Sequence, residues 1–335
     1  MRHGLSLASA LLLFSPPALA EADWFASLYT GEGVELRADE RVFTLFSVLN
    51  ATGFDDAPVT RQHPVPRRVF HPVRQQVRAR VFSGEPALRE QADLFFDAHP
   101  ATLDRYLAYT LQSAPPPFST GAKAKDLQEL KGLEGLLKAA HGGWTLQEAM
   151  AQLQGEYRRA LRPYLATLDE PLGKLRTTLK VPESGPSTLV VMNLLDAQGS
   201  VRGAVADGEV VLVVGPSEKP NLEGLLQEYA RLTLEPAVAK KAESGWSSGQ
   251  ALLREAQLSG APERSVGAYA VALLSRAAAL KALGAPEAAW DQAAGQGYFG
   301  LKELARGFDD PSRSVDGWML EALAKVEPRK PAVKK

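Results

Sequence analysis

The stretch TLVVMNLLDAQGSVRGAVADGEVVLVV, residues 188–214, decides the fold class. It is rich in Val and Leu, which favour strands, and it divides into three runs at 188–195, 201–206 and 209–214. Asp207-Gly208 separates the last two runs, and this dipeptide is typical of a tight hairpin turn. Leu and Thr alternate over 175–181, which indicates one more strand. The sequence therefore predicts a small sheet of about four strands within about 175–214.

Apolar residues recur at three- and four-residue spacing on both sides of this stretch, as they do in amphipathic helices. Residues 21–167 form a predicted helical N-terminal half. Residues 168–326 hold the predicted sheet and then a second group of helices. The fold class that we expect is α+β and mostly helical. Residues 327–335 are basic and predict a disordered tail.

The N-terminus has the pattern of a secretory signal peptide. An apolar run from Leu5 to Phe14 follows one Arg, and it is too short to span a bilayer as a helix. Ala18-Leu19-Ala20 then provides a cleavage signal of small residues. We therefore expect residues 1–20 to be removed near Ala20, so that the protein is exported to the periplasm or secreted. No later stretch is apolar enough to predict a membrane span.

Composition excludes several kinds of chemistry. The chain of 335 residues contains no Cys, which excludes thiol nucleophiles, zinc–thiolate sites and iron–sulfur clusters. The formal net charge of −1 provides no overall attraction for nucleic acid, so no nucleic-acid partner is expected. Only five His are present, and none lies downstream of residue 141.

The helix predicted at 222–241 follows the last strand and Pro220. Asn221 is a suitable N-cap for it. Its apolar residues share one face, while Gln227, Glu228 and Arg231 share the other. On residues alone, this polar set could simply be the solvated face of an amphipathic helix.

The order of these elements resembles exported bacterial zinc-metallopeptidase-like proteins of the gluzincin type. Those proteins have a helical N-terminal half, a short sheet, and then a helix that carries H-E-x-x-H followed by a proline. The matching frame here is Gln227-Glu228-x-x-Arg231, with Pro236 slightly further on. The resemblance implies that Glu228 stands at the general-base position. It also implies that the third zinc ligand would fall at Glu263 or Ala268, on the helix predicted at 262–283.

The motif departs from this family at both zinc-binding His. Gln227 is a poor zinc ligand, and the guanidinium of Arg231 has no lone pair to donate. We therefore expect no zinc and no other cofactor, and zinc is expected only if this motif frame is wrong. Glu228 can pair with Arg231 at i+3, and Arg231 with Glu235 at i+4. Arg231 would thus supply the positive charge that a metal supplies in the family.

One further motif is Gly245-Trp246-Ser247-Ser248-Gly249, which fits the G-x-S-x-G pattern of a nucleophile elbow. The residues before it are polar and helix-like, and no His follows to complete a triad. We interpret this motif as a turn followed by a helix start.

Three hypotheses for the function remain open. In the first, the chain is an exported, non-catalytic metallopeptidase-like protein that binds a peptide or protein ligand in a remnant cleft. In the second, it is an active secreted hydrolase with a non-standard site. In the third, it is a structural or interaction protein of the cell envelope without a cleft function.

Overall fold

The computed structural model describes residues 27–54, 68–182, 185–310 and 312–327. The predicted signal peptide and nearly all of the predicted basic tail lie outside these residues. The fold class is confirmed: the chain is α+β, mostly helical, with one small mixed sheet.

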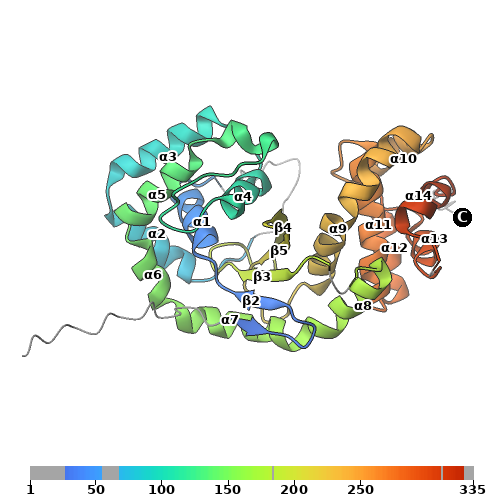
Figure 1. Ribbon diagram of the computed structural model, residues 1–335, viewed down its shortest axis with the longest axis horizontal. Coiled ribbons are helices and arrows are strands. Elements are labelled where there is room, and N and C mark those ends of the chain that lie inside the picture. Colours follow the sequence, from blue (N-terminus) through green and yellow to red (C-terminus); the bar gives the residue numbers. More distant parts are fainter. Residues whose placement is uncertain (1–26, 55–67, 183–184, 311, 328–335) are drawn as a thin grey trace, which may run out of the picture.

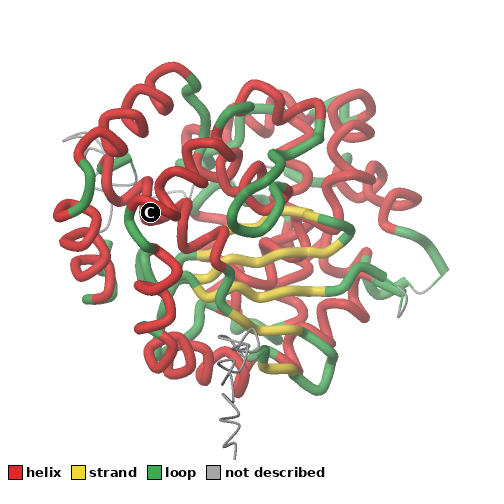
Figure 2. Tube along the Cα trace, turned by 60° about the vertical axis from the view of Figure 1, so that its left-hand side comes forward, coloured by secondary structure: helices red, strands yellow, loops and turns green. Residues whose placement is uncertain are grey.

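The sheet has five strands in the order β1-β2-β3-β5-β4 (Figure 2). The outer pairs, β1 with β2 and β5 with β4, are antiparallel, whereas β2–β3 and β3–β5 are parallel. The strands are β1 (Leu28–Tyr29), β2 (Glu35–Arg37), β3 (Thr188–Met192), β4 (Val201–Ala206) and β5 (Glu209–Val214). All five residues of β3 are buried, as expected for a central strand with parallel neighbours.

The first group of helices gathers mainly on one side of the sheet, α7 passes beneath it in Figure 1, and α8 lies beside α9 and α11 of the second group. These helices are α1 (Glu40–Thr52), α2 (Val73–Ser83), α3 (Pro86–Ala98), α4 (Leu103–Gln112), α5 (Leu133–Gly143), α6 (Leu146–Gln152), α7 (Gln154–Thr167) and α8 (Asp169–Leu179), with a 3₁₀ helix at Lys125–Leu130. Helix α1 is the core of this group, because ten of its thirteen residues are buried.

The second group lies on the other side of the sheet and begins with the long helix α9 (Figure 1). Its members are α9 (Leu222–Gly245), α10 (Gly249–Leu258), α11 (Val266–Ala282), α12 (Glu287–Gly295), α13 (Leu301–Gly307) and α14 (Val315–Leu323). Helix α11 packs along α9 and is buried on nearly all sides. Helix α9 also contacts β4 and β5, so it joins this group to the sheet.

The structure corrects one predicted strand. Residues 175–179 belong to α8, and only Lys180 and Val181 of the predicted strand lie beyond the end of this helix. The buried residues of α8 are Leu172, Leu175 and Leu179, which recur at helical spacing. The alternation of Leu and Thr was too short to distinguish a strand from a helix that begins further upstream.

The structure also adds two strands, β1 and β2, within the N-terminal half that was predicted to be helical. They have two and three residues, too few for a period-two pattern to emerge. Strand β2 pairs with β3, which lies about 150 residues later in the chain. No local pattern indicates such a pairing.

Every helix within the described ranges is either too short or too polar to cross a lipid bilayer.

Candidate functional site

Helix α9 carries the predicted motif residues on its polar face. The side chain of Asn221 caps the helix and accepts a hydrogen bond from the backbone N–H of Gly224 at 3.0 Å. Gln227, Glu228 and Arg231 are half-buried on the face that points away from the helical core. The residues that anchor the opposite face are Leu225, Leu226, Tyr229 and Ala230, all fully buried.

Arg231 pairs with both neighbouring carboxylates, as the spacing predicted. Its Nε and Nη2 donate to the two carboxylate oxygens of Glu228 at 2.8 and 2.7 Å. Its Nη1 donates to Oε2 of Glu235 at 2.7 Å. The contact with Glu228 is bidentate, which fixes the planes of both groups. Glu228 is the more buried carboxylate, with a side chain 19% exposed against 52% for Glu235.

The electrostatics of this cluster keep Arg231 charged. Its pKa is raised above the usual value, first by the hydrogen bond to Glu228, then by the charges of Glu228 and Glu235, while burial opposes the shift. A guanidinium that keeps its protons offers no lone pair to a metal ion. Arg231 therefore holds a fixed positive charge at the position where H-E-x-x-H places its second His.

Glu228 lies against the edge strand β4 at Gly203. A Cβ atom at residue 203 would come within 3.0 Å of Cγ and Oε1 of Glu228 and within 2.7 Å of a methyl carbon of Leu232. Only glycine lets the strand and the helix approach this closely without a shift. The motif carboxylate therefore packs directly against the edge strand of the sheet.

The unpaired backbone groups of β4 can be assigned from the sheet register. Gly215 donates to the carbonyl of Ser200 at 2.9 Å, so Ser200 and alternate residues after it face β5. Val201, Gly203 and Val205 therefore turn their backbone groups outward. Consistent with this, Nε2 of Gln112 donates to the carbonyl of Val205 at 3.3 Å.

A second ion cluster flanks the same edge, and sequence reasoning missed it. Arg202 of β4 donates to Asp196 at 3.0 Å and to Asp104 of α4 at 3.1 Å. Asp196 is almost fully buried, and the charge of Asp104 also contributes to the raised pKa of Arg231. Charged residues from both helical groups thus meet around β4. Asp104 and Arg202 are 98 residues apart, so no spacing rule could have paired them.

The two predicted third-ligand positions lie elsewhere. Oε1 of Glu263 accepts a hydrogen bond from the hydroxyl of Tyr298 at 3.1 Å, among the C-terminal helices. Ala268 is exposed in the first turn of α11, and its neighbour Gly267 contacts the carbonyl of Ala239. Ala239 is eleven residues beyond Glu228, about 16 Å along the helix axis.

Within the described ranges, no group of three or more His, Asp or Glu could hold a metal ion. The first two ligand positions hold Gln and Arg, and the structure does not bring a third carboxylate to them. The residues present therefore do not fit a zinc site of the H-E-x-x-H kind.

The G-x-S-x-G motif lies at the turn between α9 and α10, as predicted. Gly245 ends α9, and Gly249 begins α10. No strand precedes Ser247, so the strand–turn–helix geometry of a nucleophile elbow is not met.

A polar cavity of about 620 Å³ lies at the far end of the same edge strand. Its walls come from β2, from α1, from the segment after α4 and from the hairpin of β4 and β5. The charged residues that line it are Arg37, Arg41, Lys123, Asp207 and Glu209. Ligand-sized space therefore continues from the β4 edge into a region with charges of both signs.

Comparisons of this chain with protein-family models, with curated proteins and with solved structures give no match. The resemblance to gluzincin-type proteins thus rests on the residues and the order of elements given above.

Proposed function

We propose that the protein is an exported, non-catalytic metallopeptidase-like protein that binds a peptide in extended conformation along β4. One observation supports this proposal above the others. Glu228, at the general-base position of the motif frame, packs against the edge strand β4 and is held there by Arg231 instead of by a metal-bound water.

The loss of catalysis follows from the contacts of Glu228. In a zinc peptidase this carboxylate accepts a proton from water that the metal has made acidic. Here both of its oxygens accept hydrogen bonds from Arg231. A carboxylate whose two oxygens are engaged in this way is poorly placed to take a proton from water, and ordinary water beside it is a weak nucleophile.

Peptide binding follows from the edge of the sheet. A strand edge with free N–H and C=O groups can accept an extended peptide as one more strand. Val201 and Gly203 turn such groups away from β5, but Gly203 is buried and Val201 half-buried, and the carbonyl of Val205 is already bound by Gln112. Pairing would therefore centre on Val201, with the chain end reaching toward the 620 Å³ cavity.

A matched pair of proline variants tests this proposal. Val201→Pro removes an outward N–H from the β4 edge while sparing the ladder to β5, and Tyr29→Pro does the same at the β1 edge. The probe is a random pentapeptide library, with retained peptides quantified by mass spectrometry. We expect Val201→Pro to weaken retention about three- to tenfold, the worth of one hydrogen bond, and Tyr29→Pro to leave it unchanged.

Other outcomes would favour the other hypotheses. Equal retention by both variants would contradict binding at β4. Cleavage of casein by the purified protein, abolished by a chelator, would make it an active hydrolase. No retention and no cleavage would favour a structural role in the envelope.

Export is part of the same proposal and rests on the N-terminal pattern. Expression of the full chain in a bacterium should give a processed protein in the periplasm or medium whose first residue is Glu21. N-terminal sequencing of that protein checks the cleavage site. An unprocessed chain that stays in the cytoplasm would contradict export.

A further inference from the structure

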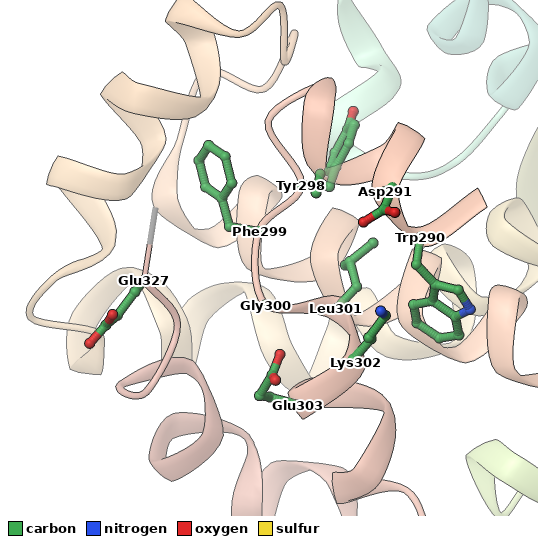
Figure 3. A pocket seen from close by; sticks show the side chains of 10 residues that line it. Trp290, Asp291, Tyr298, Phe299, Gly300, Leu301, Lys302, Glu303 and Glu327 are labelled. Carbon is green, nitrogen blue, oxygen red and sulfur yellow. The ribbon is translucent and has the colours of Figure 1, made fainter. Parts of the chain in front are cut away.

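A separate cavity of about 250 Å³ lies among the C-terminal helices, far along the chain from the β4 edge. Figure 3 shows side chains from α12, from the turn into α13, from α13 itself and from Glu327 around it. The cavity is smaller than the roughly 300–1,000 Å³ of sites for drug-sized ligands. Its volume suits a single long side chain or a small molecule of that size.

Aromatic residues form much of the wall, and hydrogen bonds hold two of them. Nε1 of Trp290 donates to the carbonyl of Ala285 at 3.1 Å. The hydroxyl of Tyr298 donates to Glu263 at 3.1 Å. Phe299 is also buried, and its ring points away from Trp290 (Figure 3). The rings are thus positioned before any ligand arrives, which lowers the entropic cost of binding.

The charges around the cavity are mainly negative and partly unpaired. Three carboxylates line it, from Asp291, Glu303 and Glu327, against the single ammonium of Lys302. Lys302 is already hydrogen-bonded to Glu287. Within the described residues, Asp291 and Glu327 have no ion-pair partner. The electrostatic balance at the cavity therefore favours a cation.

We propose that this cavity binds one guanidinium or alkylammonium group, with the ring of Trp290 against its face and Asp291 as its counter-ion. Aromatic faces attract such cations, and removal from water strengthens the attraction. The guanidinium of Arg276 already lies 4.0 Å from the ring centre of Tyr298, so the ligand contact is assigned to Trp290 and not to Tyr298. This inference does not depend on peptide binding at β4.

Three sources could supply the cation: a Lys or Arg side chain of a partner peptide, a free amine, or residues 328–335 of this chain. That last segment follows Glu327 directly and reads PRKPAVKK. The chemistry of recognition is the same for all three, so the experiment must separate them.

The test uses NMR of the indole N–H signals, with the Trp290 signal assigned by Trp290→Phe. N-acetylarginine methylamide is titrated against N-acetylcitrulline methylamide, which is nearly the same in shape but neutral. We expect the arginine compound alone to shift the Trp290 signal, and to do so less at high salt. Asp291→Asn should weaken this binding roughly two- to fivefold, while Asp93→Asn, an exposed carboxylate on α3, should not.

The titration is run on the chain from Glu21 to Lys335 and on a chain that ends at Glu327. Binding to both chains supports a ligand from outside. A titration with cadaverine, a free diamine, then distinguishes a free amine from a peptide side chain. Binding only to the shorter chain supports the same site with residues 328–335 as its occupant. Equal shifts with arginine and citrulline, or no shift of Trp290 in either chain, would overturn the proposal.

Discussion

The two edges of the sheet differ in length and in what surrounds them. Strand β1 has two residues, and its exposed Tyr29 projects to solvent. Strand β4 has six residues, with ion clusters on both sides of it. A very short edge strand is one common protection against unwanted pairing, and nearby charge is another. The β4 edge has the length that pairing with a further strand requires, and α4 packs against it.

The comparison of the two edges also shows which charged residues hold neighbouring elements together. At β4, Arg202 links the sheet to α4, and Arg231 neutralises carboxylates on α9. These contacts hold the two helical groups at the edge without filling the outward backbone groups of Gly203 and Val201. If the comparison is right, substitutions at β4 should affect stability strongly, and equivalent ones elsewhere should not.

The largest effect is expected for Arg202→Met. The change leaves the carboxylate of Asp196, which is 3% exposed, without its cation. An uncompensated buried charge is strongly destabilising, so we expect a loss of about 3 kcal/mol in the free energy of unfolding. Urea denaturation measures this loss. The control Arg159→Met removes a guanidinium that is 75% exposed and should change stability by less than about 0.5 kcal/mol. Equal losses in both would show that Arg202 is not structural.

A smaller effect is expected for Gly203→Val. The new side chain would press on Leu232 and Glu228, and overpacking of this kind costs about 1–2 kcal/mol. Because the neighbours are the ends of side chains, they can yield in part. Gly135→Ala in α5 is the matched control, since nothing lies within 4 Å of a Cβ there. That control should be neutral or slightly stabilising, as alanine favours helix. A neutral Gly203→Val would mean that α9 and β4 are less closely packed than described.

Local sequence patterns predicted much of this arrangement. The β-rich runs gave β3, β4 and β5 because each is long enough to show its residue preference and is bounded by turn residues. The ion pairs of Arg231 followed from helical spacing. Strands β1 and β2 and the pair Asp104–Arg202 could not be predicted, because each depends on contact between segments far apart in the chain.

A still smaller effect on stability is expected for Arg231→Gln. The lost pairs are partly exposed, with the Arg231 side chain 35% exposed, so we expect a cost of only about 0.5–1 kcal/mol. Lys174→Gln in α8 breaks an exposed i, i+4 pair, and it should cost less still. Denaturation of both variants at low and high salt measures the difference. If Lys174→Gln costs as much as Arg231→Gln, then the β4 cluster is an ordinary surface network.

The smallest effect is expected in acid and concerns the other side of the sheet. Asp39 caps α1 just after β2, and its side chain is buried. Burial raises the pKa of this carboxyl. The hydrogen bonds from Arg41 and the charges of Arg41 and Arg37 outweigh burial and leave the pKa below its usual value. A carboxyl whose pKa is lower when folded stabilises the protein above its unfolded pKa of about 3.9. That contribution should disappear as the pH falls through the folded value.

The unfolding free energy of the native chain should therefore fall more steeply between about pH 4 and pH 2 than that of Asp39→Asn, whose amide can still cap the helix. Denaturation across this range compares the two slopes. Parallel slopes would mean that Asp39 gains nothing from Arg41. A clear difference would show that both sides of the sheet depend on a buried carboxylate, so that the β4 edge differs from β1 in its length and not in having a buried charge.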